Sequence, residues 1–410
     1  MSLREDADRV VRESIEKVLP DRAVAQALRE KTFSRGRLVT VAAGKAAWQM
    51  AKAARDLLGD RIDAGVVVTK YGHVKGEIPS MACLEAGHPL PDANSFSATQ
   101  AALRLVSDLR AEDTVLFLLS GGGSALFEDP LIPGEELCSL TQRLLASGAS
   151  IVEMNTIRKR LSKVKGGKFA KLCEPAQVYT IVLSDILGDP LDMIASGPAY
   201  PDSSTSREAL ALAEKYGLPL SDAAREALKR ETPKTLSNVE TRVTGSVKEL
   251  CRAAASSLRV LGYEPFILTD QLNCEAREAG AFLASVARSH QGTKKSLAFL
   301  AGGETVVHLT GKGKGGRNQE LALAAAEGIS GLAGTALFSF GSDGTDGPTD
   351  AAGGFCDGDT RDLLLGKGME IYQVLRDNDS YRALEKTGGL IFTGPTGTNV
   401  NDLAVVLIRR

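Results

Sequence analysis

The sequence predicts an α/β protein with two domains. At 410 residues, the chain exceeds the roughly 250 to 300 residues at which a single hydrophobic core stops growing. Short apolar runs rich in β-branched residues alternate with longer helical patterns, which is typical of parallel β/α architecture. A polar stretch from Pro201 to Thr241 interrupts this rhythm, and the rhythm then restarts, so we expect one sheet on each side of it.

The first predicted domain spans residues 1–238 and holds a doubly wound sheet. It opens with an amphipathic stretch from Val10 to Leu28, and a helix from Lys45 to Leu58 follows the first strand. Each strand is an apolar run bounded by turn residues. The predicted strands cover residues 38–43, 65–69, 114–119 and 178–183.

The second predicted domain spans residues 239–410 and is a smaller α/β unit. We leave open whether its closing strands return to the first domain. A long loop rich in Gly and Asp follows the last clear strand, and such loops in compact domains are usually functional or disordered. Helices are expected at 246–261 and 274–288, and strands at 264–269, 296–300 and 335–340.

Composition excludes several classes of protein. Lys plus Arg (49) nearly balances Asp plus Glu (51), so no net field favours nucleic acid or an anionic membrane. The acidic N-terminus does not resemble a secretory signal, and no run of 18 apolar residues occurs. Six cysteines are scattered without C-x-x-C pairs, which favours reduced thiols. We therefore expect a cytoplasmic protein that binds neither nucleic acid nor membrane.

Two candidate motifs follow predicted strands, where ligands bind in open α/β sheets. In the first, Gly44 allows a tight turn and Lys45 stands at a helix N-terminus, where a cation is favourable only beside an anion. The alternative is a solvated surface lysine. The second is the run Ser120, Gly121, Gly122, Gly123 and Ser124, whose backbone N–H groups can converge on phosphate. The alternative is a flexible turn.

Two further motifs lie in the first predicted domain. Read as a helix, the basic segment 155–168 places Arg158 and Lys165 on one face, within reach of one anion, although a solvated basic face is equally compatible with the pattern. After the strand 178–183 come Asp185 and Asp189, and carboxylates at a strand end can hold Mg²⁺. The alternative is that they form turns or cap helices.

The fifth motif belongs to the second domain. Glu304 follows a strand, and Arg317 and Asn318 open a helix, where arginine can bind phosphate or carboxylate with two hydrogen bonds. The glycines before this helix match G-x-G-x-x-G, but an isolated glycine pattern is weak. No G-x-S-x-G motif occurs, the acidic loop lacks EF-hand spacing, and the four histidines lack metal-ligand spacing. A serine hydrolase, a calcium site and a zinc enzyme are therefore disfavoured.

Together these motifs resemble the class II glycerate 2-kinase family. The resemblance spans the chain and its C-terminal third is similar to the MOFRL domain. It rests on Ala43 to Ala47, Leu119 to Ser124, Asn155 to Arg158, Val164 to Gly167, Leu183 to Asp189, Gly302 to Thr305, Gly315 to Glu320, Asp343 to Asp350 and Thr393 to Asn399. It implies a Rossmann-like α/β/α domain, a MOFRL domain and an active site in the cleft between them.

The resemblance also implies ATP-dependent phosphorylation of D-glycerate at its 2-hydroxyl, with Mg²⁺ as cofactor. Lys45 and Arg317 would be the catalytic pair. The assigned roles are nucleotide phosphate binding for Gly44, residues 120–124 and Lys165, substrate binding for Arg158 and Asn318, and metal binding for Asp185, Asp189 and Glu304. The partners would be small molecules, and the oligomeric state stays open.

Two other functions remain to be weighed. An NAD(P)H-dependent hydroxypyruvate reductase would use the glycine pattern, but no acid lies at the expected distance of about 20 residues beyond it. A non-catalytic sugar-phosphate sensor would not need a lysine and an arginine at separate helix N-termini. Both alternatives are disfavoured relative to the kinase.

Overall fold

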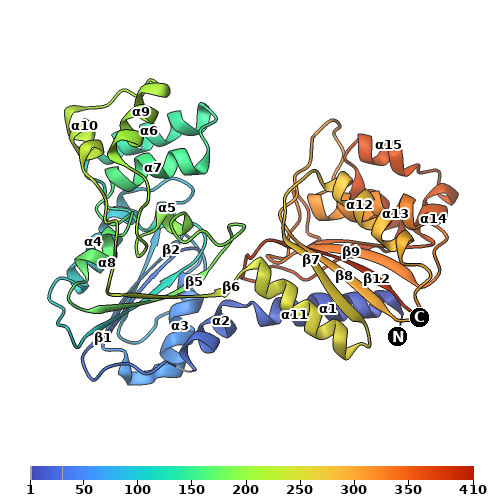
Figure 1. The fold of residues 1–410 in the computed structure, drawn as a ribbon, viewed down its shortest axis with the longest axis horizontal. Helices are drawn as coiled ribbons and strands as arrows, with labels where there is room; N and C mark the ends of the chain where they lie inside the picture. The colour runs from blue at the N-terminus through green and yellow to red at the C-terminus, as the bar shows by residue number, and fades with distance from the viewer. Residues whose placement is uncertain (1, 30) are drawn as a thin grey trace. The chain divides into compact units, whose positions relative to one another are not determined.

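The structure is a computed structural model that describes residues 2–29 and 31–410, and it divides into two compact units (Figure 1). The central unit is Pro20–Thr244. The terminal unit joins Met1–Leu19 to Gly245–Arg410. The expected division at residue 238 lies close to Thr244, whereas the first segment, Met1–Leu19, groups with the C-terminal part of the chain rather than with the N-terminal domain.

The central unit holds a six-stranded sheet in the order β3-β2-β1-β4-β5-β6. Strand β1 pairs in parallel with β2 and β4, and the pairs β2–β3 and β4–β5 are also parallel. This is the strand order of the doubly wound Rossmann fold, so the predicted fold class is confirmed. The strands are β1 (Leu38–Ala43), β2 (Ala64–Lys70), β3 (Met81–Ala86), β4 (Thr114–Leu119), β5 (Gln177–Leu183) and β6 (Val239–Gly245).

Both faces of this sheet are covered because its strands are apolar throughout. Val41 and Phe117 belong to a buried cluster on one face, with side chains of α4 and α8. Ala42 and Leu118 belong to the cluster on the opposite face, with side chains of α2 and α3. Full burial of such an aliphatic side chain contributes about 1.5 to 3 kcal/mol. The helices are α2 (Pro20–Leu28), α3 (Ala47–Leu58), α4 (Ala93–Leu105), α5 (Gly123–Leu126) and α8 (Lys168–Leu172), with short 3₁₀ turns η1 (Gly59–Arg61) and η2 (Ile194–Ser196).

A separate helical cluster completes the central unit. It consists of α6 (Gly134–Ala146), α7 (Ile151–Leu161), α9 (Ser206–Lys215) and α10 (Asp222–Lys229) around their own apolar core. The expected helix over 155–168 is wrong in its second half. Helix α7 ends at Leu161 because Ser162 is extended and the next helix starts at Lys168, so Arg158 and Lys165 do not share a helical face.

The terminal unit holds a mixed six-stranded sheet in the order β11-β10-β9-β12-β8-β7. Strands β7 and β8 are parallel, as the β/α rhythm predicts. The pairs β8–β12, β12–β9, β9–β10 and β10–β11 are antiparallel. The closing strands therefore stay in the terminal unit. The strands are β7 (Glu264–Leu272), β8 (Leu297–Gly303), β9 (Thr335–Gly341), β10 (Gly353–Asp357), β11 (Leu390–Ile391) and β12 (Asp402–Ile408).

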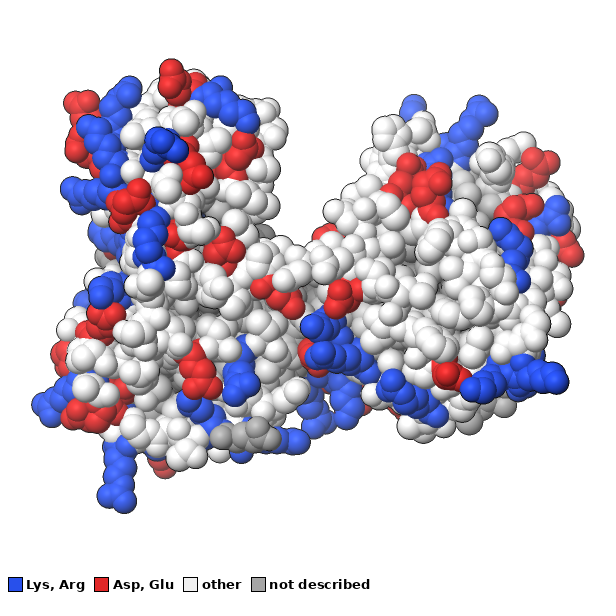
Figure 2. All heavy atoms as spheres, viewed as in Figure 1, with Lys and Arg blue, Asp and Glu red and all other residues white. Residues whose placement is uncertain are grey.

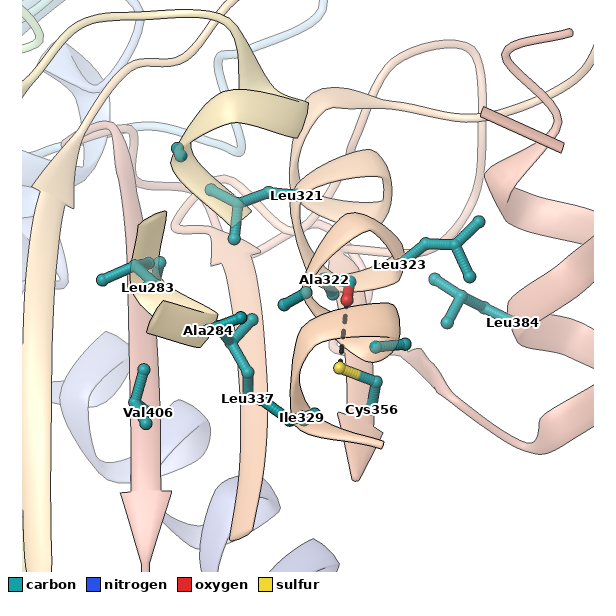
Figure 3. Packing of buried hydrophobic residues seen from close by; sticks show 14 of the residues in the cluster. Leu283, Ala284, Leu321, Ala322, Leu323, Ile329, Leu337, Cys356, Leu384 and Val406 are labelled. Carbon is teal, nitrogen blue, oxygen red and sulfur yellow. Dashed lines mark hydrogen bonds between the residues drawn. The ribbon is translucent and has the colours of Figure 1, made fainter. Parts of the chain in front are cut away.

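Helices α12 and α13 pack on one face of this sheet. Figure 3 shows Leu283 and Leu321 from these helices beside Leu337 and Val406 of the sheet, with Cys356 donating to the Ala322 carbonyl at 3.0 Å. The remaining helices α14, α15 and α16 extend this layer. The helices are α12 (Ala276–Ser289), α13 (Arg317–Ile329), α14 (Thr360–Gly366), α15 (Ile371–Arg376) and α16 (Ser380–Thr387).

Helices α1 (Leu3–Lys17) and α11 (Val247–Val260) pack together within the terminal unit. Ser257 of α11 donates to Glu13 of α1 at 2.6 Å. The amphipathic N-terminal stretch is therefore two helices, because Pro20 begins a new helix, α2, in the central unit.

Surface charge agrees with the balanced composition. On the face drawn in Figure 2, basic and acidic side chains are interspersed over both units. All six cysteines are free thiols. None of the helices within residues 2–29 and 31–410 combines the length and apolar character needed to cross a membrane.

Candidate active site

Two predicted motifs meet where the strand order of the central sheet reverses. The loops after the neighbouring strands β1 and β4 touch through their backbones. Lys45 N–H donates to the Gly121 carbonyl at 2.8 Å, and Ala46 N–H donates to Ser120 Oγ at 3.0 Å. A strand-order switch point is the usual ligand site of an open α/β sheet. The turn with Lys45 and the glycine-rich loop therefore form one candidate site.

Two glycines make this contact possible. Gly44 has φ +128°, and a Cβ there would lie 2.2 Å from Ser120 Oγ. Gly122 has φ +85°, and its Cβ would lie 3.0 Å from the His88 ring and 3.2 Å from Lys45 Cγ. A larger residue would strain the backbone at both positions. At Gly44 it would also collide with Ser120, and at Gly122 it would press on the His88 ring and the Lys45 side chain. Gly44 and Gly122 are thus required by the architecture of the site.

Lys45 supplies an available cation at the start of α3. Within the described part of the chain, its ammonium forms no hydrogen bond or ion pair. Its backbone, by contrast, is held firmly: the Lys45 carbonyl accepts hydrogen bonds from His73 Nδ1 at 3.0 Å and Thr69 Oγ1 at 3.3 Å. A positioned cation without a protein partner is suited to bind an anionic ligand.

Asp185 lies against the glycine-rich loop. A Cβ on Gly121 would stand 2.1 Å from Asp185 Oδ2, so this carboxylate sits beside the backbone that could contact phosphate. Asp189 follows in the same loop with φ +51°. No group of three or more metal-ligating side chains occurs in residues 2–29 and 31–410. Mg²⁺ commonly uses one or two carboxylates together with substrate phosphates, and Asp185 and Asp189 fit that mode.

The end of the glycine-rich loop is tied to two other segments. Ser124 Oγ lies 3.0 Å from Ser196 Oγ, which donates to Asn155 Oδ1 at 2.9 Å. Ser196 and its neighbour Ala195 both have positive φ, at +61° and +51°. Such strain costs about 1 to 3 kcal/mol per residue and clusters at functional sites.

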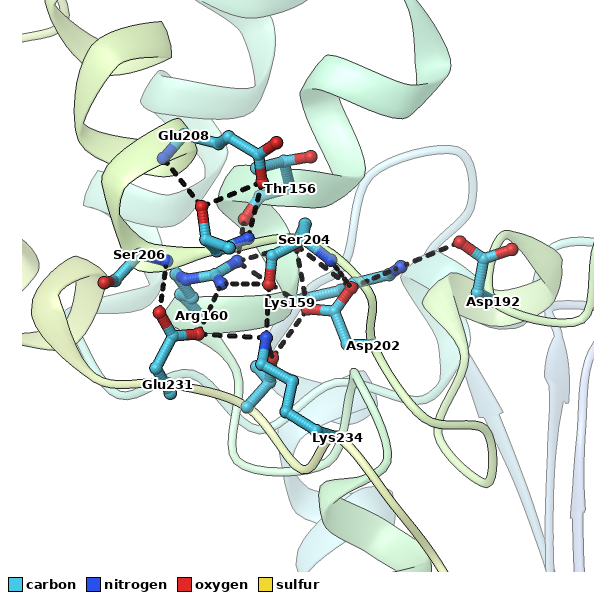
Figure 4. A network of polar contacts seen from close by, with 12 residues as sticks. Thr156, Lys159, Arg160, Asp192, Asp202, Ser204, Ser206, Glu208, Glu231 and Lys234 are labelled. Carbon is cyan, nitrogen blue, oxygen red and sulfur yellow. Dashed lines mark hydrogen bonds and ion pairs between the residues drawn. The ribbon is translucent and has the colours of Figure 1, made fainter.

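Buried ion pairs hold this strained segment in place (Figure 4). Lys159 of α7 is almost fully buried and contacts Asp202 at 3.1 Å and Asp192 at 3.3 Å. Arg160 completes the network with Glu231 at 3.2 Å. Removing one partner of a buried pair leaves an uncompensated charge. The basic face of α7 therefore serves the fold around the site and is not a solvated surface.

Arg158 and Lys165 are also used internally. Arg158 is 8% exposed and donates to the Ser124 carbonyl at 2.9 Å. Lys165 is fully buried, pairs with Glu128 at 2.7 Å and donates to the Phe127 carbonyl. Burial lowers the pKa of Lys165 to about 8, although Glu128 opposes this shift. Arg158 therefore stabilises the end of the glycine-rich loop, and Lys165 stabilises the segment that follows it. Lys165 has no exposed surface that could contact a phosphate.

In the terminal unit, Arg317 at the start of α13 is surrounded by carboxylates. Its guanidinium donates to Asp402 at 2.6 and 3.0 Å and to Glu304 at 2.7 Å. Although burial opposes the charged form, hydrogen bonds and charge from Asp402 raise the pKa of Arg317 further. The side chain remains 34% exposed. Glu304, expected as a metal ligand, is instead bound to Arg317 and to Asn401 at 3.2 Å.

Asp346 occupies the N-terminus of α13, where a ligand anion was expected. Its carboxylate accepts the backbone N–H groups of Asn318 at 3.1 Å and Gln319 at 2.9 Å. It thereby replaces the cap that Gly316 cannot provide. Burial raises the pKa of Asp346 to about 6. Asn318 is buried and bonds to Asp346 and Ser339, so its amide positions this loop rather than facing solvent.

The glycines before α13 are packed against the chain itself. A Cβ on Gly311 or Gly313 would lie 2.3 or 2.5 Å from backbone atoms of Asp377, and one on Gly316 would lie 2.3 Å from Asp346 Cγ. The segment between β8 and α13 is irregular rather than a tight strand-to-helix turn. These glycines therefore serve close backbone packing, and the dinucleotide-binding reading of this motif has no structural support.

Sequence reasoning missed four residues of these two clusters. His73 and His88 lie beside Lys45, and Asp346 and Asp402 surround the start of α13. His88 could have been found, because it follows β3 in the way that Lys45 follows β1, but β3 was not predicted. Asp346 lies within the motif Asp343 to Asp350, but no role was assigned to it. Its contacts with the start of α13, and those of Asp402 with Arg317, are tertiary contacts that the local sequence does not indicate.

The fold is that of an α/β protein with a doubly wound sheet in one unit and a mixed sheet in the other. The candidate site, at the switch point of the doubly wound sheet, is suited to bind an anion. Residues 6–229 match the model of a domain of unknown function (DUF4147), and residues 297–402 match the MOFRL family.

Known proteins of similar sequence and structure agree with this pairing. The chain is 54% identical to a D-glycerate 2-kinase of Thermotoga maritima, covering 99% of both chains. A crystal structure of glycerate kinase from the same organism superposes with a TM-score of 0.96, again covering 99% of both chains. A protein of Agrobacterium vitis provisionally named a hydroxypyruvate reductase is 38% identical and covers 100% of this chain and 95% of its own.

The chain belongs to the glycerate 2-kinase family, in which a DUF4147 domain is combined with a C-terminal MOFRL domain. The family resemblance predicted from the motifs is confirmed.

Proposed function

We propose that this protein is an ATP-dependent kinase that phosphorylates D-glycerate at the 2-hydroxyl, giving 2-phospho-D-glycerate and ADP. The observation that carries the proposal is the meeting of Lys45 with the glycine-rich loop at the switch point of the central sheet. Membership of the glycerate 2-kinase family supports the substrate and the reaction. Free thiols and the use of ATP support a cytoplasmic location.

The residues of the switch point suit phosphoryl transfer. That reaction asks a protein mainly for alignment and charge compensation. We propose that backbone N–H groups of residues 120–124 bind nucleotide phosphates and that Lys45 stabilises the transferring phosphoryl group. The Lys45 ammonium, which has no partner among the described residues, and the absence of side chains on Gly121, Gly122 and Gly123 support these roles.

Asp185 and Asp189 are the residues we propose to hold Mg²⁺, together with nucleotide phosphates. When bound, Mg²⁺ neutralises phosphate charge that would otherwise oppose attack by the hydroxyl. The support is the position of Asp185 against Gly121. Glu304 is withdrawn from this group, because Arg317 and Asn401 already engage both of its carboxylate oxygens.

Arg317 is the second proposed catalytic residue. Three hydrogen bonds to Asp402 and Glu304 fix the orientation of its guanidinium, and a preorganised cation stabilises transition-state charge better than a mobile one. Its remaining exposed surface leaves room for contact with a ligand.

A product assay tests this function. The purified protein is incubated with ATP, D-glycerate and Mg²⁺, and phosphorus NMR separates the 2-phosphate from the 3-phosphate. We expect the 2-phosphate, with turnover abolished by EDTA. A parallel assay with NADH or NADPH and hydroxypyruvate should show no oxidation of the nicotinamide. Formation of the 3-phosphate alone, or steady nicotinamide oxidation, would refute the proposal.

A further inference from the structure

The imidazole of His88 lies against the glycine-rich loop of the switch-point site. A Cβ built on Gly122 would be 3.0 Å from His88 Cδ2 and 3.1 Å from its Nε2. The same Cβ would be 3.2 Å from Lys45 Cγ. The Cδ2–Nε2 edge of the ring thus faces the glycine-rich loop, on the side where the Lys45 side chain runs.

The His88 ring is not used to hold the fold together. It is half-buried, and within residues 2–29 and 31–410 it forms no hydrogen bond. In His73, by comparison, Nδ1 forms a hydrogen bond with the Lys45 carbonyl. Both nitrogens of His88 are therefore available to a ligand, which distinguishes it from a histidine that is satisfied within the core.

The surroundings of His88 keep the ring uncharged. Burial lowers its pKa to about 4, and the positive charges of Lys45, Lys70 and His73 add to this effect. A neutral imidazole at pH 7 carries a lone pair that can accept a proton.

The charges that shift the pKa of His88 are positive ones, and two acids close to it in the chain are bound to other groups. Asp92 accepts hydrogen bonds from Tyr71 at 2.6 Å and from the backbone of Ser95 at 2.9 Å. Glu85 accepts the backbone N–H of Val74 at 2.9 Å. His88 therefore combines a neutral ring with the absence of a hydrogen-bond partner among the residues that the structure describes.

We propose that His88 is the general base of the reaction: Nε2 accepts the proton of the acceptor hydroxyl as phosphoryl transfer proceeds. The hydroxyl oxygen forms a bond to the γ-phosphorus, the bond between that phosphorus and the β,γ-bridging oxygen breaks, and ADP leaves with the electron pair. The proton moves to His88 and is later released to solvent. This inference rests on the proposed function and adds a catalytic residue to it.

The alternative bases fit less well. Asp185 and Asp189 are the carboxylates proposed to hold Mg²⁺, and a metal-bound carboxylate is a poor proton acceptor. Lys45 is the residue proposed to stabilise the transferring phosphoryl group, a role that its ammonium fills as a charge and not as a base. General base catalysis typically contributes about 10² to 10⁴-fold to the rate, so loss of His88 should be readily measured.

The test compares His88→Ala and His88→Gln with wild type in the glycerate kinase assay. We expect kcat to fall at least 10²-fold in both variants, with the KM for ATP changed by less than about threefold. Imidazole added to the His88→Ala enzyme should restore part of kcat, because it can enter the vacated space. It should not restore His88→Gln, whose side chain fills that space. The exposed His290 at the end of α12 provides a matched control, since His290→Ala should retain full activity.

The outcomes separate this inference from the proposed function. A wild-type enzyme that makes 2-phosphoglycerate, with His88→Ala and His88→Gln within about threefold of its kcat, overturns the role of His88 alone. Failure of imidazole to rescue a folded His88→Ala enzyme also overturns the role of a base. A wild-type enzyme that makes no phosphoglycerate overturns the proposed function and this inference together.

Discussion

The Arg317 guanidinium donates two parallel hydrogen bonds to the Asp402 carboxylate, from Nε at 2.6 Å and from Nη2 at 3.0 Å. A lysine cannot reproduce this geometry, because its ammonium is a point charge. We therefore predict that Arg317→Lys lowers kcat by about 10²-fold or more. It should also lower the free energy of unfolding by about 1 to 3 kcal/mol, since Asp402 loses its partner.

Steady-state kinetics and urea unfolding measure both effects. Arg361 provides the control, because its ion pair with Glu327 lies at the surface and such pairs contribute about 0 to 1 kcal/mol. Arg361→Lys should match wild type. An Arg317→Lys enzyme with wild-type kcat and stability would remove both proposed roles of the guanidinium.

Gly122 should be essential for nucleotide binding. Gly122→Ala places a methyl group against His88 and Lys45 at a position with φ +85°, so we predict at least a tenfold rise in the KM for ATP, about 1.4 kcal/mol of binding. Gly148 also has positive φ, at +69°, but has open space where a Cβ would be. Gly148→Ala therefore controls for backbone strain alone. Equal KM values for ATP in the two variants would show that this loop does not bind the nucleotide.

Asp346 should make stability depend on pH. Burial raises its pKa to about 6, above the value of roughly 3.8 to 3.9 in an unfolded chain. The native state therefore binds the proton more tightly, and the stability this contributes is complete below pH 3.8 and is lost as the pH rises through 6. The Asp346→Asn variant should not lose stability in this way, because an asparagine side chain does not titrate.

Urea unfolding of wild type and Asp346→Asn at pH values from 4 to 7 tests this sign. The free energy of unfolding of the variant, relative to wild type, should increase by about 2 to 3 kcal/mol between pH 4 and pH 6.5. A difference that stays constant, or that decreases, would show that Asp346 titrates normally.

Lys165 should matter for stability rather than for ATP binding. It is fully buried against Glu128, and removal of one partner of a buried pair costs about 3 to 5 kcal/mol. We predict this loss for Lys165→Met, with an unchanged KM for ATP. Lys171, whose side chain is 59% exposed beside the partly exposed Glu174, is the control, and Lys171→Met should be nearly neutral. A stable Lys165→Met enzyme with a raised KM would instead support the phosphate-binding role expected from sequence.

The sequence predicts the fold well where one signal dominates. Strands β1 and β4 were predicted with the bounds that the structure has, because each is a short apolar run that ends at glycine or serine. Strand β3 is partly exposed, with the run Met-Ala-Cys-Leu-Glu-Ala, and gave no comparable signal. The mixed pairing of the terminal sheet depends on long-range contacts of β12, and periodicity does not report them.

The candidate site was predictable only in part, because some of its residues are placed by contacts between distant parts of the chain. Lys45 and residues 120–124 follow strands directly, so the rule for open α/β sheets finds them. In the sequence, Arg158 and Lys165 cannot be told apart from cations that bind a ligand. Tertiary packing, however, buries Arg158 against Ser124 and Lys165 against Glu128. The contacts of Arg317 with Asp402 join residues far apart in the chain, and nothing local indicates them.

The central claim is that Lys45 acts on the transferring phosphoryl group, and the kcat of Lys45→Ala tests it most directly. Lys52 of helix α3, whose side chain is 41% exposed and pairs with Asp56, provides the control as Lys52→Ala. With saturating ATP, D-glycerate and Mg²⁺, we predict that Lys45→Ala lowers kcat by about 10³-fold, while Lys52→Ala stays at the wild-type value. A folded Lys45→Ala enzyme with kcat within about threefold of wild type would contradict the claim.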